Sequence, residues 1–309
     1  MKKHLLLLSL LIVTALALAG CGSANAKEPK ETVKIAYLPI THSLAALEEA
    51  DEFEGNDQIG IELVKYGSWP ELLDALNSGQ VDGASVLIEL AMKSKAEGVG
   101  IKAVALGHKD GNVIVVSNDV KDGADLKGRT IAIPHRQSSH NILVNDALSR
   151  NGLTTSDINV VELAPTEMPS ALAAGTIDGY CVAEPFGAMG VSIGAGKVLY
   201  TSEELWENSV CCALVLTDKF IENHPDTAKA FVEGYKTAGN NLDPETTKAV
   251  AKKYLNQKDE EVLDISLKWI SYDDLAITEE QYNELAKKVK AYGLSDNPPA
   301  YADFVINDF

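Results

Sequence analysis

The architecture of this chain follows from two adjoining runs, VKIAYLP at residues 33–39 and SLAALEEA at residues 43–50. A short run rich in β-formers is followed at once by a helical pattern. The same pair recurs as IGIELVKYG (59–67) with WPELLDALNSG (69–79), and IKAVALG (101–107) continues the series. Such alternation is typical of parallel sheets covered by helices. The sequence therefore predicts an α/β fold with parallel-rich sheets.

Helix punctuation agrees with this pattern. Ser68 and Glu71 have the spacing of a capping box at the start of one helix. Gly79 and Gly98 follow two helical runs at the positions where glycine commonly ends a helix.

A second series of strands and helices begins after VIVVSN at residues 113–118 and ends at VCCALVL at residues 210–216. These two strand segments bracket an insert with its own βαβ pattern, which predicts a second lobe joined through a two-strand hinge. Ligands of open α/β sheets bind beyond the carboxyl ends of the strands, and two hinged lobes can close over a small molecule. The tail after residue 217 is expected to be helical, with no strands of its own, and Thr278 and Gln281 form another capping-box pattern.

The first segment has the features of an export signal. Lys2 and Lys3 precede an apolar run over residues 5–19, which is shorter than the roughly 20 residues of a membrane-spanning helix. The run Leu-Ala-Gly-Cys ending at Cys21 resembles the bacterial lipobox, so Cys21 is the predicted lipidation site; a secreted protein cut near Ala26 is the alternative. The predicted segments are a signal peptide (1–20), a lipidated flexible linker (21–32), lobe I (33–117 with 211–309) and lobe II (118–210).

Composition narrows the class of protein. The chain has 309 residues, of which 46% are hydrophobic, and its 45 acidic residues against 27 Lys and Arg give a net charge of -18. Such an acidic chain is a poor partner for nucleic acid. The four cysteines are too few for a disulfide framework, and the neighbouring Cys211 and Cys212 are badly placed to bridge each other.

Signatures of catalysis and of cofactor binding are missing from the sequence. No G-x-G-x-x-G follows a predicted strand, and there is no H-E-x-x-H, paired C-x-x-C or G-x-S-x-G. The sequence therefore predicts neither a nucleotide cofactor nor an enzyme.

Polar and aromatic residues follow the predicted strands of the first lobe, where free N–H groups at helix starts favour anions and polar ligands. The candidate ligand-binding residues there are Pro39, Thr41, His42, Trp69, Ser85 and His108. Each has an ordinary alternative. Ser43 next to them would simply cap a helix, Trp69 would pack in a hydrophobic staple, Ser85 would be a turn residue, and His108 with Lys109 would form a solvated surface pair.

The densest polar cluster of the second lobe is PHRQSSHN at residues 134–141, between a predicted strand and a helix. Its candidate ligand-binding residues are Gln137, Ser138, Ser139 and His140, which offer amide, hydroxyl and ring N–H groups. A capping loop with incidental histidines is the alternative. Metal binding by His135 and His140 is disfavoured because no cysteine or carboxylate accompanies them, so no metal site is predicted. Glu184, at another helix start, is the last candidate; its alternative role is electrostatic, at the helix N-terminus.

Several segments, in this order, carry a family resemblance: VKIAYLP (33–39), WPELLDALNSGQVDGAS (69–85), LKGRTIAIP (126–134), SSHNILV (138–144), MPSALAAGTIDGYCVAEPFGA (168–188) and VCCALVL (210–216). The chain resembles, over residues 33–242, the substrate-binding lipoproteins of ABC importers for nitrate, sulfonates and taurine, a group that includes bicarbonate and thiamine-pyrimidine binders. The resemblance implies a two-lobed periplasmic-binding-protein-like fold of type II. It also implies that His140 contacts the ligand and that Trp69 matches the pocket tryptophan of the group.

The same resemblance implies a function. The chain would be a receptor on the outer face of the bacterial plasma membrane, facing the periplasm in a Gram-negative cell, anchored through Cys21, and it would deliver a small solute to a permease and its ATPase. A receptor that feeds a signalling protein is a further alternative. Thiamine-pyrimidine synthases resemble this fold too, but they carry a cysteine-rich run where this chain has only Cys211 and Cys212, and the export signal favours the receptor.

Glu184 departs from the family pattern. A carboxylate facing bare nitrate would repel it unless a cation lies between them or the side chain turns away. Bicarbonate with a cation, a zwitterion such as taurine, and a neutral pyrimidine are therefore all compatible ligands.

Overall fold

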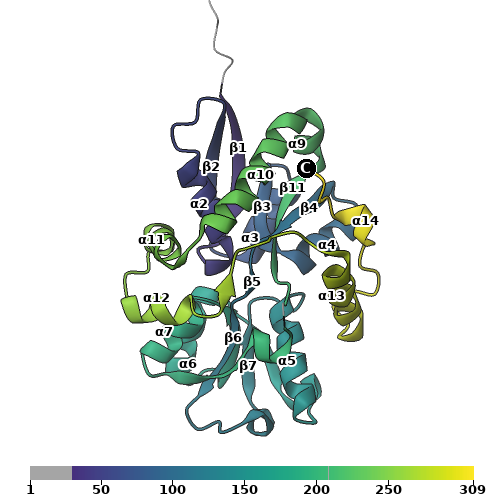
Figure 1. Cartoon of the computed structure of the whole chain (residues 1–309). Coiled ribbons are helices and arrows are strands. Elements are labelled where there is room, and N and C mark those ends of the chain that lie inside the picture. Colours follow the sequence, from purple (N-terminus) through teal and green to yellow (C-terminus); the bar gives the residue numbers. More distant parts are fainter. Residues whose placement is uncertain (1–29, 208) are drawn as a thin grey trace, which may run out of the picture.

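A computed structural model describes residues 30–207 and 209–309, which form two α/β lobes, one above the other in Figure 1. The predicted signal peptide, Cys21 and the linker up to residue 29 lie outside the described residues. Among the helices that the structure describes, none combines the length and apolar character needed to cross a bilayer.

Lobe I is built on a five-stranded sheet with the order β2-β1-β3-β11-β4. Its strands are β1 (Glu31–Tyr37), β2 (Ile59–Lys65), β3 (Gly83–Leu87), β4 (Ile101–Leu106) and β11 (Cys212–Thr217). β1 runs parallel to β2 and β3, whereas β11 runs antiparallel to both β3 and β4. The start of β11 therefore lies at the same edge of the sheet as the carboxyl ends of β1, β3 and β4.

Helices follow the strands of lobe I as the alternating pattern predicts. They are the 3-10 turn η1 (Thr41–Ser43), α2 (Leu44–Glu52), α3 (Trp69–Asn77), α4 (Ile88–Ala96), α9 (Asp218–Asn223) and α10 (Pro225–Asn241). Gly79 and Gly98 follow α3 and α4 with φ of 70° and 94°, which confirms their predicted role as helix ends. The predicted capping box of α3 is wrong, because the Ser68 side chain makes no cap hydrogen bond.

Lobe II has a second five-stranded sheet with the order β10-β6-β9-β7-β8. Its strands are β6 (Asn112–Ser117), β7 (Thr130–Ile133), β8 (Asn159–Glu162), β9 (Gly179–Ala183) and β10 (Gly196–Thr201). β7 is parallel to β8 and β9, whereas β6 is antiparallel to β9 and β10. Because β6 belongs to this sheet, the first lobe ends before residue 112 and not at residue 117 as predicted.

Short helices cover the second sheet. They are η2 (Gly123–Leu126), α5 (Ser139–Arg150), η3 (Thr155–Asp157), η4 (Pro165–Glu167), α6 (Met168–Ala173), α7 (Phe186–Ser192) and α8 (Ser202–Leu205). The chain crosses between the lobes twice. The first crossover is residues 107–111, including β5 (Lys109–Asp110), and the described part of the second is residues 206–207 and 209–211.

The C-terminal tail was predicted to belong to lobe I alone. In the structure it contacts both lobes. Its elements are α11 (Pro244–Tyr254), α12 (Glu260–Ser266), β12 (Ile270–Ser271), α13 (Glu279–Ala291) and α14 (Tyr301–Phe304). β12 pairs with β5, so the prediction of a tail without strands is wrong. Near the end of α13, Lys288 Nζ and Tyr292 Oη lie 2.9 and 2.5 Å from the Asp146 carboxylate of α5, whereas Val305 bridges to Ala103 in lobe I.

Candidate functional site

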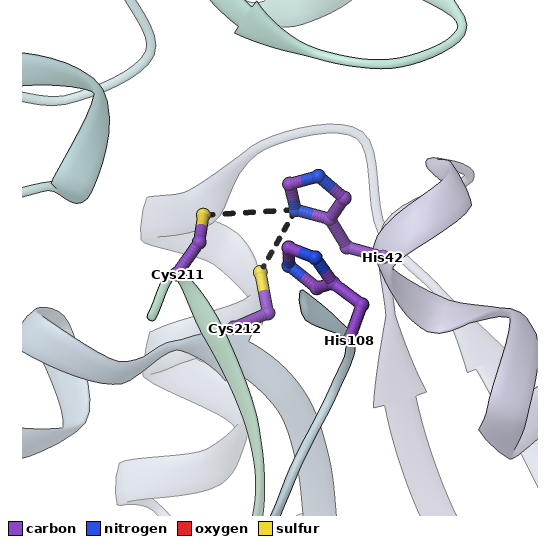
Figure 2. Close-up of side chains that lie close together, drawn as sticks. All are labelled: His42, His108, Cys211 and Cys212. Atoms are coloured by element: carbon purple, nitrogen blue, oxygen red, sulfur yellow. Dashed lines mark hydrogen bonds between the residues drawn. The ribbon is translucent and has the colours of Figure 1, made fainter. Parts of the chain in front are cut away.

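Four buried side chains form what we call the histidine–cysteine cluster, defined as His42, His108, Cys211 and Cys212 (Figure 2). One nitrogen or sulfur atom from each lies within 4.8 Å of those of the other three. His42 follows β1, His108 follows β4, and the two cysteines stand where β11 begins. These strand ends meet because β11 runs against β3 and β4, so the cluster lies at the edge of lobe I where the crossovers lead to lobe II.

The orientation of the His42 ring is set by the first crossover. Its Nε2 lies 3.2 Å from the carbonyl oxygen of Gly111, and a carbonyl can only accept a hydrogen bond. The Nε2 atom therefore carries the proton, which leaves the lone pair of Nδ1 directed at the two sulfurs. Cys211 Sγ is 3.6 Å and Cys212 Sγ is 3.5 Å from Nδ1.

His108 lies against the ring of His42, with 3.4 Å between ring centroids and 26° between ring planes. Neither nitrogen of His108 has a hydrogen-bond partner within the described part of the chain. Burial lowers the pKa of His108 to about 4, so the ring is neutral at physiological pH and keeps a lone pair available.

The two thiols differ in their acidity. Burial opposes ionisation of Cys211, but the hydrogen bond from Cys212 and the imidazoles of His140 and His42 hold the pKa of Cys211 well below its ordinary value. Burial and the neighbouring Cys211 raise the pKa of Cys212 well above its ordinary value.

Gly107 allows the end of β4 to approach the cluster. Its N–H donates to the carbonyl oxygen of Cys212 at 2.7 Å. A Cβ atom at position 107 would lie 2.9 Å from the carbonyl oxygen of His42 and 3.1 Å from Cys212 Cβ, which is closer than such atoms normally come. Packing at this point therefore requires glycine.

Further buried polar groups of both lobes lack ordinary hydrogen bonds. Both ring nitrogens of His140 and the hydroxyl of Ser139, from the start of α5 in lobe II, make no hydrogen bond of ordinary geometry to any described residue. The carboxyl oxygens of Glu89 in α4 also lack a hydrogen bond of ordinary geometry, but Ser139 interacts with this carboxyl from lobe II. The buried indole nitrogen of Trp69 in α3 has no partner among the described residues. Cys211 interacts electrostatically with both His140 and Glu89, which places these groups near the cluster.

Buried polar groups without partners are rare in folded proteins, and each calls for an explanation. Burial lowers the pKa of His140 to about 4 and raises the pKa of Glu89 well above its ordinary value. His140 is therefore neutral at physiological pH and can donate a hydrogen bond, and burial favours the protonated form of Glu89, which can donate as well. Donors from two lobes around one buried region are what a small polar ligand requires.

Glu184 links the lobes through its main chain. Its carbonyl oxygen accepts from Thr41 N at 2.8 Å and from Thr41 Oγ1 at 3.0 Å. Its carboxylate accepts from Ala188 N, 2.8 Å away in α7, and lies 3.5 Å from the hydroxyl of Ser266. Burial raises the pKa of Glu184 to about 7. The carboxylate is thus held at the start of α7, by groups outside the histidine–cysteine cluster.

Two of the predicted residues in lobe II make hydrogen bonds to backbone carbonyls of the protein. Gln137 Nε2 donates to the carbonyl oxygen of Leu294 in the tail at 3.1 Å. Ser138 Oγ donates to the carbonyl oxygen of His135 at 2.6 Å and accepts from Asn141 N at 3.3 Å, as an N-cap of α5.

In lobe I, Ser85 and Pro39 lie beside η1. Ser85 Oγ lies 3.3 Å from Ser43 Oγ and 3.5 Å from the carbonyl oxygen of His42. Pro39 is half-buried in the turn that leads into η1. Ser43 does not cap α2 with its side chain, because its hydroxyl donates to Leu38 O at 3.1 Å.

Cys211, Cys212 and Glu89 are the residues of this region that sequence reasoning did not select. The cysteines stand in an apolar run, and the expectation of no metal site rested on the separate pair His135 and His140. The sequence position of the two cysteines, at the start of the returning strand, could have indicated their place in the site. A strand returning antiparallel into a parallel sheet begins where the other strands end, so a Cys pair at its start meets the histidines that follow those strands.

Comparisons with known proteins agree with this architecture. A family model described as NMT1-like matches residues 26–256. A Bacillus subtilis protein provisionally named as an aliphatic sulfonates-binding protein is 30% identical over 251 residues, which are 77% of this chain and 73% of that protein. A solved Staphylococcus aureus structure, described as the ligand-binding component of an ABC-type import system with zinc bound, is 40% identical with a TM-score of 0.86, and the match covers 90% of this chain and 97% of that one.

The bicarbonate transport ATP-binding protein CmpC of Synechocystis is 26% identical over 242 residues. The match covers 71% of this chain but only 35% of that longer protein. This chain therefore spans about a third of such a relative.

Proposed function

The chain belongs to the NMT1-like family, and we propose that it is the extracytoplasmic solute-binding protein of an ABC importer. One observation carries the proposal. Buried polar groups of both lobes come together near Cys211, with His140 and Ser139 from lobe II and Glu89 from lobe I. Such a receptor needs to hold a small polar solute between its lobes and release it to a permease with a cytoplasmic ATPase.

The proposed solute belongs to the nitrate, sulfonate, taurine and bicarbonate class. The buried rings and hydroxyls of this region provide hydrogen-bond donors for an oxyanion, and the relatives named for sulfonates and bicarbonate support this class. A thiamine-precursor pyrimidine is the alternative solute. Zinc joins the candidate ligands because the Staphylococcus aureus structure is described with zinc bound.

We further propose that the mature chain is lipidated at Cys21 and anchored to the outer face of the plasma membrane. The basic residues, the apolar run and the Leu-Ala-Gly-Cys sequence at the start of the chain support this placement. A receptor tethered in this way stays close to the permease.

One observation favours an enzyme of the same fold, such as a pyrimidine synthase, as the second candidate. Cys211, whose pKa is lowered by Cys212 and nearby imidazoles against the effect of burial, lies beside His42, and nucleophilic catalysis uses such a pair. The two functions differ in outcome, since a receptor returns its ligand chemically unchanged.

A thermal-shift screen tests the proposal on the chain from Lys27 onward, which includes every residue that the structure describes. The panel is nitrate, bicarbonate with and without calcium, taurine, alkanesulfonates, hydroxymethylpyrimidine and zinc. A solute at 100 times its dissociation constant is expected to stabilise the fold by about 2.7 kcal/mol. No stabilisation by any solute at millimolar concentration would contradict the proposal, and conversion of the solute, detected by mass spectrometry, would favour the enzyme.

A further inference from the structure

The distances within the histidine–cysteine cluster fit a tetrahedral metal site. Zinc binds sulfur at about 2.3 Å and nitrogen at about 2.0–2.1 Å, so a sulfur and a nitrogen on one tetrahedral ion lie about 3.6 Å apart. The two Sγ–Nδ1 distances around His42 are 3.5 and 3.6 Å.

Hydrogen bonds cannot explain why both thiols lie close to the same nitrogen of His42. Nδ1 of His42 has one lone pair, and two thiols are directed at it. Only one S–H can donate along that lone pair. A cation between the three atoms would use the lone pair and both sulfurs at once.

The surroundings of His42 are those of a metal ligand. A metal-binding histidine usually donates its other ring N–H to a carboxylate or a backbone carbonyl, which fixes the tautomer. Here Nε2 of His42 is 3.2 Å from the carbonyl oxygen of Gly111. His108 adds a fully buried ring whose two nitrogens have no partner among residues 30–207 and 209–309.

We propose that His42, His108, Cys211 and Cys212 together bind one zinc-class divalent cation. Two thiolates and two imidazoles in a tetrahedral set favour zinc over magnesium or calcium, which prefer oxygen ligands. Binding forms two metal–sulfur and two metal–nitrogen bonds and releases the two thiol protons to solvent, with no change of oxidation state. Two thiolates also balance the charge of the dication, which a buried site needs.

The position of the site gives the ion a second effect. His108 belongs to the first crossover, and Cys211 belongs to the second. An ion shared by these residues joins the two connections between the lobes, next to the region that His140 faces from lobe II. This inference does not depend on the transport role, because receptor and enzyme alike would contain the site.

Cobalt provides a spectroscopic probe of the ligands. The reduced, metal-free chain from Lys27 onward is titrated with Co²⁺, and absorption is recorded in the near-ultraviolet and visible. We expect one Co²⁺ per chain, a thiolate-to-cobalt charge-transfer band, the visible bands of a tetrahedral ion, and loss of both on addition of one equivalent of Zn²⁺. Absence of the charge-transfer band in the wild type would overturn the proposal whatever the variants do.

Cysteine variants identify the ligands. Cys211→Ala and Cys212→Ala are each expected to remove about half of the charge-transfer intensity, since one of two thiolates is lost. Each is expected to weaken zinc binding by more than about 100-fold, because changes outside the ligand set already cost 10- to 100-fold. Cys181→Ala is the matched control, a buried cysteine in β9 outside the cluster, and it should bind both metals like the wild type. An equal loss in Cys181→Ala would contradict the assignment.

Two experimental outcomes distinguish failure of this inference from failure of the transport proposal. Solute binding measured with a chelator present, together with no bound cobalt, would overturn the metal site and leave the receptor intact. One bound cobalt with both thiolates, in a protein that no oxyanion, taurine or pyrimidine of the panel stabilises, would support the metal site and count against the proposed class of solute.

Discussion

Nδ1 of His42 lies 3.5 Å from Sγ of Cys212, although 170 positions separate the two residues in the chain. This contact depends on the direction of β11, which begins at the edge of the sheet where β1 ends. It also depends on Gly107, because a larger residue there would meet both His42 and Cys212. The contact therefore reports whether lobe I is assembled as described and whether the second crossover is in place.

His140→Ala is expected to weaken solute binding by about 1 to 3 kcal/mol, because it removes a buried donor that has no partner within the described residues. Isothermal titration calorimetry with the solute found in the thermal-shift screen measures the change. His224→Ala, at an exposed position on lobe I, is the control and should bind like the wild type. Equal affinities for wild type and His140→Ala would remove His140 from the site.

Gly107→Ala is expected to destabilise the fold by about 1 to 3 kcal/mol, the usual effect of overpacking. The new Cβ would lie 2.9 Å from the carbonyl oxygen of His42, which is backbone and cannot easily move. Urea unfolding measures the loss. Gly67→Ala is the matched control, since its Cβ would meet only Glu71 Oε2, at 3.8 Å. Similar stability of the two variants would show that the chain relaxes around position 107.

Glu184→Gln is expected to change how stability depends on pH. Burial raises the pKa of Glu184 to about 7 in the folded state, against 4.5 for the ordinary group, so between these values the folded protein holds more protons than the unfolded chain. This contribution to stability therefore falls as pH rises from 4.5 to 7 and is constant above that. From pH 5 to pH 8 the wild type should lose about 2 to 3 kcal/mol more than the variant.

Urea unfolding at pH 5 and pH 8 makes this comparison. The other buried carboxyls with pKa values raised by burial, Glu49 and Glu89, are present in both proteins and cancel in the difference. Parallel pH profiles would show that Glu184 does not titrate in this range.

Cys21→Ala is expected to abolish lipid attachment and to leave an unprocessed precursor. Metabolic labelling with a fatty acid, followed by gel electrophoresis, measures attachment. The Cys181→Ala protein should be labelled like the wild type. Labelling of the Cys21→Ala protein would place the anchor elsewhere.

Local pattern was sufficient to predict the α/β class. Each strand and the helix after it lie close in sequence, and Gly79 and Gly98 end helices through a backbone angle that glycine adopts readily. The lobe boundary was misplaced because VIVVSN is apolar enough to pair in either sheet, and only its partners, β9 and β10, place it in lobe II. The tail was assigned to one lobe because its contact with lobe II is long-range. Lys288 and Tyr292 are 142 and 146 positions away from Asp146 in the sequence, so local pattern gives no sign of these bonds.

Only part of the candidate site could be predicted, because its residues come together from distant parts of the sequence. His42, His108 and His140 follow strands or begin a helix, which position alone could indicate. Cys211 and Cys212 stand in a run of apolar residues, where cysteine is typical of a buried core. Their role depends on strand direction and register, and neither is visible in composition or spacing.

Calorimetric titration of the mature chain against each solute of the panel tests whether a small molecule is held between the lobes. Wild type, His140→Ala from lobe II and Glu89→Gln from lobe I are compared under the same conditions. We predict that one solute binds with a stoichiometry of one per chain and that both variants bind it at least about fivefold more weakly, a difference of about 1 kcal/mol. Binding of no solute, or unchanged affinity in both variants, would contradict a receptor that closes its two lobes over its ligand.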